Sequence, residues 1–332
     1  MADKVRLGFI GCGGVQQKHL EALAKIEDAA ISAVCDLKAD LVQETAKKYN
    51  AKPFTDHKQM LADVKLDAVY IALPPFAHGL ELDVIRKGLP FFVEKPIGMD
   101  LKLCRKIAAR VAKKNLTTAV GYMSRYRAGV KRAKEVFNGD PAIMLYGGWV
   151  GGTPNMTAPI HQWWVVKEKS GGQLVEQTTH TVDLVRYFCG DIAEVYAAAT
   201  KGFVKGIPTF TIDDASLVTF KFKSGAIATL YSTCAANGGG GGVTLSAYAL
   251  THTAKFTGWN LDAEILTKGA QPEKFAGEQN IFEIEDRAFI KAVKTGDRSD
   301  IMTDYADGLK TAAAAIAANK SMETGKPVKP AA

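Results

Sequence analysis

Glu94, Lys95 and Pro96 follow one another directly after an apolar stretch in the first half of the chain. A lysine at the end of a buried strand can reach a cofactor held by the same sheet, where a cationic nicotinamide would lower the lysine pKa. Such a lysine can hydrogen-bond the reacting oxygen of a substrate or share in moving its proton. Because Lys95 precedes a proline, its backbone is biased toward an extended conformation. Lys95 is therefore the first catalytic candidate, and a solvated lysine after a strand is the structural alternative.

His180 and two carboxylates at helical spacing form a second group. The imidazole has an ordinary pKa near about 6.5, so it can exchange a proton around neutrality. Glu176 lies one helical turn before His180 and Asp183 about one turn after, so either carboxylate can orient the imidazole. Oxidising a secondary alcohol requires a hydride acceptor and a group that takes the hydroxyl proton. His180 is predicted to take that proton, although a packed helix histidine would show the same pattern.

A glycine turn near the start of the chain predicts a dinucleotide site. Gly11 suits a tight turn after a strand, and Gly13 allows the backbone to approach a pyrophosphate at the next helix N-terminus. Gln16 stands where a third glycine is usual. Asp36 closes the second strand, where a carboxylate would bind the ribose hydroxyls and disfavour a 2′-phosphate. NAD is the expected cofactor, with NADP possible because Lys38 is near. The cofactor candidates here are Gly11, Gly13, Gly14, Val15 and Asp36.

Other polar and aromatic residues follow predicted strands or flank His180. Pro74, His78, Glu94 and Lys95 are further cofactor candidates, although His78 is as well suited to capping or packing. Indole faces stack on the C–H faces of sugars, and arginine binds hydroxyls. A core or subunit-interface pair is the alternative for the two tryptophans. The predicted substrate contacts are Lys95, Tyr122, Arg125, Trp163, Trp164, Glu176 and His180.

Regular alternation of strands and helices in the first 120 residues predicts a parallel sheet. The expected strands are residues 5–10, 30–35, 68–72, 91–93 and 117–120. The expected helices are residues 18–26, 40–49, 58–64, 77–86 and 101–114. In the second half, strands at residues 143–150, 195–200, 215–222, 226–232 and 243–248 lack regular helices between them, which predicts a largely antiparallel sheet. Helices are expected at residues 173–188, 282–293 and 305–321.

Two domains are therefore expected, in residues 1–122 and 123–332, with the last helices packing back on the sheet or the first domain. Residues 238–242 are a run of glycines that predicts a loop between strands. No helix start follows this run, so it does not match a phosphate-binding pattern.

Composition indicates a globular protein with enough apolar residues, 47%, for two cores. The sequence contains no apolar run of about 18 residues, so no membrane span is predicted. A cytoplasmic location is expected by default. The five cysteines are scattered without CxxC spacing, which argues against disulfides and a metal site. The net charge of +7 is spread along helices, so no nucleic-acid partner is predicted.

The order of these motifs resembles that of the Gfo/Idh/MocA oxidoreductase family. The resemblance covers nearly the whole chain and includes a glycine-rich entry into a histidine helix at residues 171–183. It implies an N-terminal Rossmann domain with a doubly wound parallel sheet and a C-terminal α/β domain with a large, mostly antiparallel open sheet. It also implies reversible oxidation of a hydroxyl on a sugar or cyclitol. The chain departs from the family's DxGxH pattern, because Glu176 replaces the aspartate and Thr178 the glycine.

Three functions remain open at this point. The first is an NAD(P)-dependent sugar or polyol dehydrogenase. The second is an enzyme with tightly bound NAD that cleaves or epimerises a glycoside through transient oxidation. The third is a non-catalytic, cofactor-binding regulatory protein, against which the intact Lys95 and His180 argue. An antiparallel sheet with one apolar face uncovered also predicts a homodimer or homotetramer through the C-terminal sheet.

Overall fold

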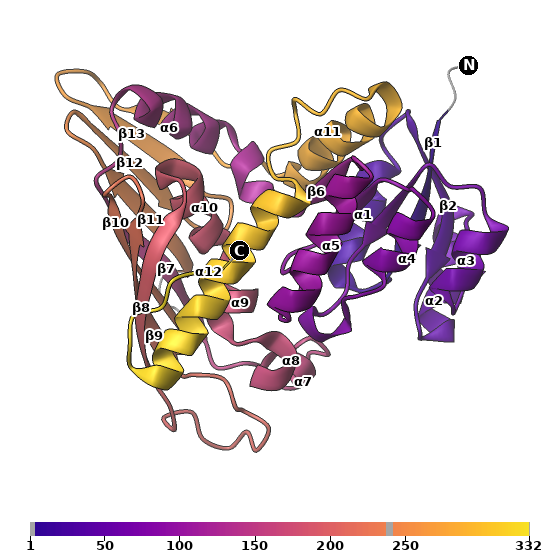
Figure 1. Ribbon diagram of the computed structural model, residues 1–332, viewed down its shortest axis with the longest axis horizontal. Coiled ribbons are helices and arrows are strands. Elements are labelled where there is room, and N and C mark those ends of the chain that lie inside the picture. The colour runs from indigo at the N-terminus through magenta and orange to yellow at the C-terminus, as the bar shows by residue number, and fades with distance from the viewer. Residues whose placement is uncertain (1–3, 237–241, 332) are drawn as a thin grey trace. The chain divides into compact units, whose positions relative to one another are not determined.

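The computed structural model describes residues 4–236 and 242–331, and the chain divides into two compact units (Figure 1). Unit 1 comprises Met1–Met123 and Asn280–Leu309, and unit 2 comprises Ser124–Gln279 and Lys310–Ala332. Unit 1 is thus built from two stretches of chain, and its second boundary falls inside the long helix α12 (Tyr305–Thr324). Of the predicted glycine loop, residues 238–241 lie outside the described residues.

Unit 1 contains a six-stranded sheet in which every pair of neighbours is parallel. This order, with β1 at the centre and later strands added on either side, is the doubly wound arrangement, so the predicted fold class is confirmed for this half. In spatial order the strands are β3 (Lys52–Phe54), β2 (Ala29–Cys35), β1 (Val5–Ile10), β4 (Ala68–Ile71), β5 (Phe91–Val93) and β6 (Thr118–Val120).

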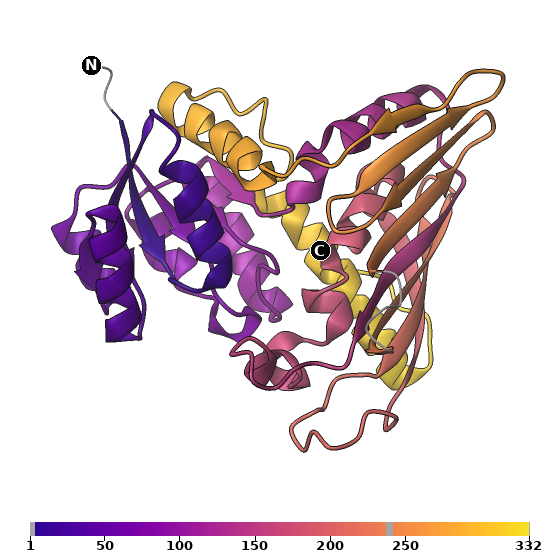
Figure 2. The same ribbon diagram turned by 180° about the vertical axis from the view of Figure 1, so that it is seen from behind.

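Helices cover both faces of this sheet. Helices α4 and α5 lie in front of it in Figure 1, and α1 lies in front of it in the opposite view of Figure 2. Helix α11 comes from the second stretch of unit 1 and packs against α1. The unit 1 helices are α1 (Gly14–Leu23), α2 (Ala39–Tyr49), α3 (His57–Asp63), the short 3₁₀ helix η1 (Pro75–Ala77), α4 (Glu81–Arg86), α5 (Leu101–Lys113) and α11 (Ile281–Thr295).

The predicted start of one helix in this unit was wrong. A single helix was expected over residues 77–86, but η1 ends at Ala77 and α4 begins only at Glu81. His78 is extended, and Gly79 has φ +128°, which no helix allows. Strand β3 was not predicted, since Pro53 lies within it. A proline is tolerated there because β3 is an edge strand.

Unit 2 contains an eight-stranded sheet that is antiparallel except for the pair β7 and β10. The prediction of a large, mostly antiparallel sheet is therefore confirmed, although the last three strands in the chain were not foreseen. In spatial order the strands are β14 (Glu273–Phe275), β13 (Asp262–Thr267), β12 (His252–Thr257), β11 (Gly242–Tyr248), β7 (Met144–Gly152), β10 (Ile227–Ala236), β9 (Ala215–Phe222) and β8 (Ile192–Thr200).

One face of this second sheet carries the core of unit 2. Strand residues such as Leu145, Phe220 and Leu230 pack there with helix residues such as Val185 and Phe188. Alternate residues of the same strands point away from that core, and several large apolar ones among them are exposed. The unit 2 helices are the 3₁₀ helix η2 (Met123–Tyr126), α6 (Ala128–Gly139), α7 (His161–Trp164), α8 (Lys167–Ser170), α9 (Gln173–Glu176), α10 (Thr179–Cys189) and the part of α12 from Lys310 onward.

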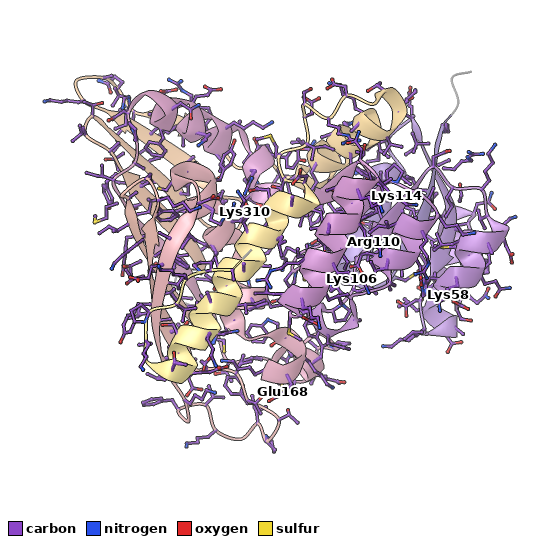
Figure 3. All side chains as sticks on the ribbon, in the orientation of Figure 1. Lys58, Lys106, Arg110, Lys114, Glu168 and Lys310 are labelled. Atoms are coloured by element: carbon purple, nitrogen blue, oxygen red, sulfur yellow. The ribbon has the colours of Figure 1, made fainter. Side chains whose placement is uncertain are left out.

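Helix α5 shows how the charged residues are distributed in unit 1. Its buried side chains are Cys104 and Ile107. Lys106 and Arg110 on its exposed face and Lys114 at its C-cap follow one another at intervals of four (Figure 3). Asp100 caps its N-terminus by accepting hydrogen bonds from the backbone N–H groups of Lys102 and Leu103. Among the described residues, no helix combines the length and apolar character needed to cross a bilayer.

Candidate active site

The glycine turn after β1 leaves an open helix N-terminus. Gly11 has φ +93°, and a Cβ there would lie 2.2 Å from the carbonyl oxygen of Ala72, so only glycine fits. A Cβ at Gly13 or Gly14 would meet nothing within 4 Å. Helix α1 starts at Gly14 with no side-chain cap, so its first N–H groups remain available to an anion. These features fit the pyrophosphate of a dinucleotide.

Asp36 ties this turn to the end of β2. Its Oδ2 accepts a hydrogen bond from the backbone N–H of Cys12 at 2.8 Å, and its Oδ1 accepts one from Lys38 N–H at 3.0 Å. A carboxylate has about four lone-pair sites, so both oxygens keep capacity for a ribose hydroxyl. Burial and the nearby Asp36 raise the pKa of the Cys12 thiol to about 12, so it stays uncharged beside the turn. Asp36 therefore supports the loop geometry in addition to its predicted cofactor role.

Glu94 and Lys95 leave the carboxyl end of β5, at the same edge of the sheet as Gly11 after β1 and Pro74 after β4. Glu94 is buried, with Oε1 3.0 Å from Nε2 of His19 and Oε2 accepting the backbone N–H of Lys95 at 3.0 Å. A Cβ on Gly121 would lie 2.5 Å from the Glu94 carboxylate. Glu94 is thus packed inside unit 1 and holds the turn that carries Lys95. The Lys95–Pro96 peptide is cis.

His78 is held by a carboxylate that the sequence did not reveal. Its Nδ1 lies 2.5 Å from Oε1 of Glu81, and Oε2 of Glu81 accepts the backbone N–H of Gly79. Burial alone would raise the pKa of the Glu81 carboxyl, but His78 and the Gly79 amide outweigh burial and hold that pKa below its ordinary value. Nε2 of His78 is buried without a hydrogen-bond partner among the described residues. Such an atom fits a polar group of a bound cofactor.

In unit 2, Glu176 is anchored by one of the two adjacent tryptophans. The indole Nε1–H of Trp164 donates to Oε2 of Glu176 at 2.6 Å, and both side chains are buried. Trp164 also packs edge-on against Trp149, with ring centroids 6.3 Å apart. Trp163 is only partly buried and lies at the border of the same apolar cluster. The two adjacent tryptophans thus differ, because Trp164 is buried and bonds Glu176 while Trp163 is partly exposed.

The helix expected over residues 173–188 is interrupted between Glu176 and His180. Helix α9 ends at Glu176, and α10 begins at Thr179, with His180 as its second residue and half-buried. The backbone N–H of Thr178 bonds to the carbonyl of Gln173, five residues back, which is a π-type turn often found at functional sites. The Thr178 hydroxyl is buried 2.7 Å from that of Ser232 on β10. Ser232 therefore satisfies the polar group that replaces the family's glycine.

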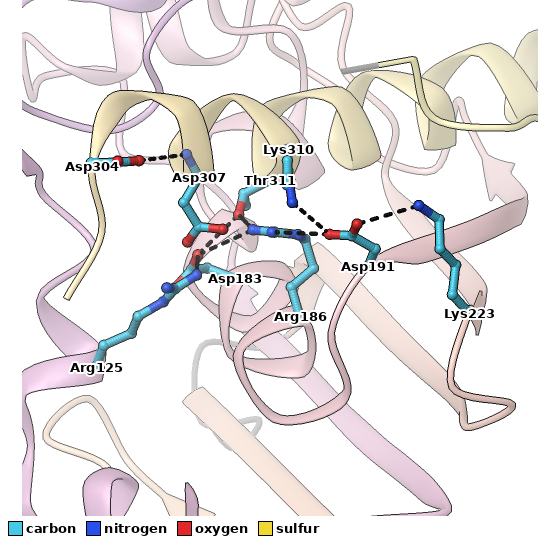
Figure 4. A network of polar contacts seen from close by, with 9 residues as sticks. All are labelled: Arg125, Asp183, Arg186, Asp191, Lys223, Asp304, Asp307, Lys310 and Thr311. Carbon is cyan, nitrogen blue, oxygen red and sulfur yellow. Dashed lines mark hydrogen bonds and ion pairs between the residues drawn. The ribbon is translucent and has the colours of Figure 1, made fainter. Parts of the chain in front are cut away.

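Arg125 and Asp183 form a buried ion pair in unit 2 (Figure 4). The guanidinium donates from Nε and Nη2 to the two oxygens of Asp183 at 2.7 and 2.6 Å. The Thr311 hydroxyl also donates to Asp183 Oδ1, and Arg186 donates to Thr311. Arg125 stacks on the ring of Tyr187 as well. This pair anchors α10, and a role for Arg125 in binding substrate hydroxyls stays a prediction.

Two family models match this chain. Residues 5–122 match an oxidoreductase family with an NAD-binding Rossmann fold, and residues 148–258 match the GFO/IDH/MocA C-terminal domain. The chain belongs to the GFO/IDH/MocA oxidoreductase family. This assignment confirms the resemblance drawn from the motifs, the enzyme class of oxidoreductase and the NAD cofactor.

Relatives of this GFO/IDH/MocA oxidoreductase include two inositol dehydrogenases. Myo-inositol 2-dehydrogenase of Thermotoga maritima is 26% identical over 230 residues, covering 67% of this chain and 66% of the relative. Inositol 2-dehydrogenase 3 of Saccharopolyspora erythraea is 29% identical over 229 residues, covering 67% and 64%. The matched region thus spans about two thirds of the length of these relatives.

Solved structures share the fold of this GFO/IDH/MocA oxidoreductase over its whole length. A levoglucosan dehydrogenase in complex with NADH superposes with a TM-score of 0.89 at 19% identity, covering 99% of this chain and 100% of that one. Myo-inositol 2-dehydrogenase from Lactobacillus plantarum gives a TM-score of 0.83 at 22% identity, with coverage of 99% and 100%. At this identity the likeness establishes the fold.

Three titratable residues near the candidate site of this GFO/IDH/MocA oxidoreductase were not predicted from the sequence as part of it. Glu81 follows His78 by three residues, a spacing that pairs side chains in turns and helices, so a local signal was present. His19 follows the glycine turn and reads as one of the apolar-face residues of α1. Asp286, which contacts His19, lies 267 residues away and left no local signal.

Proposed function

We propose that this oxidoreductase transfers a hydride between NAD(P) and a secondary hydroxyl of a sugar, a sugar derivative or a cyclitol, with Lys95 and His180 in proton transfer. The observation that carries the proposal is the place of Lys95. It follows β5 at the carboxyl edge of the parallel sheet, where the glycine turn also lies, and in such sheets ligands bind at that edge. The names of the inositol and levoglucosan dehydrogenases support the substrate class.

His180 has the surroundings expected of a group that exchanges protons. It lies in the first turn of α10, half-buried, four residues after a carboxylate whose position is set by Trp164. Asp183 is committed to Arg125, which leaves Glu176 as the carboxylate of this segment that can assist His180. Glu176 thus takes the place of the family's usual aspartate in this proposal.

The proposed chemistry divides the substrate's hydrogens between two acceptors. NAD bound at the glycine turn and Asp36 would supply the acceptor for the hydride of the carbon that bears the hydroxyl. His180 takes the hydroxyl proton as the carbonyl forms, and Lys95 hydrogen-bonds the reacting oxygen or shares in the proton relay. In the reverse direction His180 returns the proton to the oxygen. Asp36 supports NAD over NADP, since a carboxylate at that position repels a 2′-phosphate.

We also propose a homodimer or homotetramer that forms through the outer face of the unit 2 sheet. Large apolar side chains on its neighbouring strands β7, β10, β9 and β8 are 44–57% exposed. Contiguous apolar patches of this kind mark association surfaces. The residues are Met144, Tyr146, Tyr196, Leu217 and Ile227. Light scattering of the wild type and of Leu217→Lys tests this, because a charge in the interface would shift the assembly to monomer.

The decisive experiment mixes the enzyme and excess NAD with a panel of sugars, cyclitols and glycosides. NADH absorbance is followed while the products are examined in parallel. Steady NADH accumulation with one polyol supports the dehydrogenase. Product formed from a glycoside without net NADH would instead favour redox-assisted cleavage, and binding of ligands without turnover would favour the regulatory protein.

A further inference from the structure

We propose that His19 is a permanently charged positioning residue, an imidazolium whose contact with Glu94 fixes the turn that carries Lys95. This inference rests on the proposed function insofar as Lys95 acts in catalysis. All the groups involved lie within unit 1.

The ring of His19 is completely buried between two carboxylates. Its Nδ1 lies 2.8 Å from Oδ1 of Asp286 on α11, and its Nε2 lies 3.0 Å from Oε1 of Glu94 after β5. While the two carboxylates are ionised they only accept hydrogen bonds, so each ring nitrogen must donate. A histidine that donates from both nitrogens is an imidazolium. Burial raises the pKa of the Asp286 carboxyl, and the contact with His19 counters part of that rise. Burial by itself lowers the pKa of His19, but Asp286 and Glu94 raise it well above the ordinary value of 6.5.

Three aromatic rings and a third carboxylate also surround the imidazole ring of His19. Phe92 and Phe282 contact it edge-on with centroids 4.9 and 5.1 Å away, and Tyr70 lies at 5.6 Å. These rings exclude water, which strengthens the pairing of the charges. Glu285, next to Asp286, places a carboxylate oxygen within 4.8 Å of the His19 and Glu94 atoms. The acidic groups that face the ring are therefore Glu94, Asp286 and Glu285.

The carboxylate of Glu94 contacts both His19 and the backbone of Lys95. Glu94 uses Oε1 for His19 and Oε2 for the backbone N–H of Lys95. Gly121 leaves room for this carboxylate on its far side. The contact with His19 therefore fixes the direction of the Glu94 carboxylate, and Glu94 in turn orders the backbone from which the Lys95 side chain departs.

A metal ion is a different interpretation of the same atoms, since His19, Glu94 and Glu285 could offer one ligand each. The distance of 3.0 Å from Nε2 to Oε1 is that of a direct hydrogen bond. A zinc ion held by both atoms at about 2.0 Å would require a wider separation at tetrahedral angles. The geometry thus favours a proton between the two groups.

The direct test is ring-nitrogen NMR of the full chain with labelled histidines. His19 should retain both N–H protons at about pH 8.5, far above the ordinary histidine pKa. His57, whose Nε2 lies 2.8 Å from Oδ2 of Asp83 and whose pKa is lowered by burial, is the internal control and should be neutral there. Loss of one N–H proton from His19 in this range would overturn the proposal. A stoichiometric metal in protein purified without chelator would overturn it as well.

The functional test compares His19→Gln with the control His57→Gln, using the substrate found by the NADH screen. We expect kcat to fall roughly 10-fold to 100-fold in His19→Gln, the range seen when a group that orients a functional ligand is lost, while the Kd for NAD changes little. An unchanged kcat, or an equal loss of NAD affinity, would refute the positioning role. Asp286→Asn removes one charge with little change in volume and serves if His19→Gln does not fold. If no substrate turns over at all, the proposed function fails while the NMR result still decides the charge of His19.

Discussion

The indole Nε1–H of Trp164 donates a hydrogen bond of 2.6 Å to Oε2 of Glu176. Both partners are buried, so the bond is made in an environment where an unpaired carboxylate is costly. It joins α7 to the C-terminal end of α9, just before the interruption that precedes His180. A residue expected to stack on substrate thus directs a carboxylate of the candidate site.

Replacing Trp164 with phenylalanine should keep most of the packing and remove this hydrogen bond. A buried group that loses its partner costs about 1–3 kcal/mol, so the melting temperature and kcat should both fall. Trp259→Phe, at an exposed site, is the control and should change neither. Thermal unfolding and steady-state kinetics measure the two effects. An unchanged kcat in a destabilised Trp164→Phe would show that the bond serves folding alone.

Lys95→Ala should abolish turnover while NAD binding persists, because the ammonium is expected to act on the substrate oxygen. His180→Asn should slow the reaction by roughly 10²-fold to 10⁴-fold, the usual contribution of an acid or base. Lys106→Ala and His252→Asn are matched controls. Lys106 is exposed on α5, and His252, on β12, pairs with Asp140. Turnover and NADH fluorescence titration separate catalysis from binding. Equal loss of NAD binding in Lys95→Ala would point to a structural lysine.

Two glycines of the same turn should respond differently to alanine. Gly13 has φ −69° and ψ −179°, which alanine adopts readily, and its Cβ would meet no protein atom within 4 Å. Gly13→Ala should therefore fold normally and bind NAD weakly, because the methyl group occupies the space of the pyrophosphate. Gly11→Ala should lose stability, on the order of 1–3 kcal/mol, from its positive φ alone. Full NAD affinity in Gly13→Ala would place the pyrophosphate elsewhere.

Asp36→Ala should weaken NAD binding and reduce the preference for NAD over NADP. The backbone N–H of the buried Cys12 loses its acceptor, at about 1–3 kcal/mol, and the exposed N–H of Lys38 loses its acceptor to water at little cost. Asp56→Ala is the control, because Asp56 accepts from Lys58 N–H at the start of α3 in the same manner. That control should lose about 1 kcal/mol of stability and keep its NAD affinity. Calorimetric titration with both cofactors distinguishes the outcomes.

The Glu81 carboxyl should make the free energy of unfolding depend on pH in the acidic range. Its folded pKa lies below the ordinary value of 4.5, so its contribution is fully present above that value and is lost as pH falls through the folded pKa. The stability advantage of the wild type over Glu81→Gln should therefore shrink below about pH 4.5. Urea unfolding over a pH series measures it, with the exposed Glu21→Gln as the control. A difference that stays constant with pH would contradict the assigned direction.

Local periodicity was sufficient to predict five of the six strands of the parallel sheet, since each of them carries its own apolar pattern, whereas the short edge strand β3 does not. It failed where a short segment changes direction. At Gly79 the partner is the nearby Glu81, whereas the hydroxyl of Thr178 pairs with Ser232, which is remote in sequence. The motif around Lys95 was recognisable. The contacts that hold it were not, since Glu94 meets His19 across 75 residues and His19 meets Asp286 across 267.

Helix α11 has a consequence for the order in which the protein is made. The ribosome releases β1 to β6 and the whole stretch Ser124–Gln279 before Asp286 is synthesised. Until then the nascent dinucleotide domain lacks one of the two carboxylates that balance the charge of His19. Its completion must wait for nearly the entire chain, and a fragment that stops after β6 would lack both the Asp286 carboxylate and the Phe282 ring that contact His19. The first domain in the sequence therefore becomes complete only after the stretch Ser124–Gln279 of the second has been synthesised.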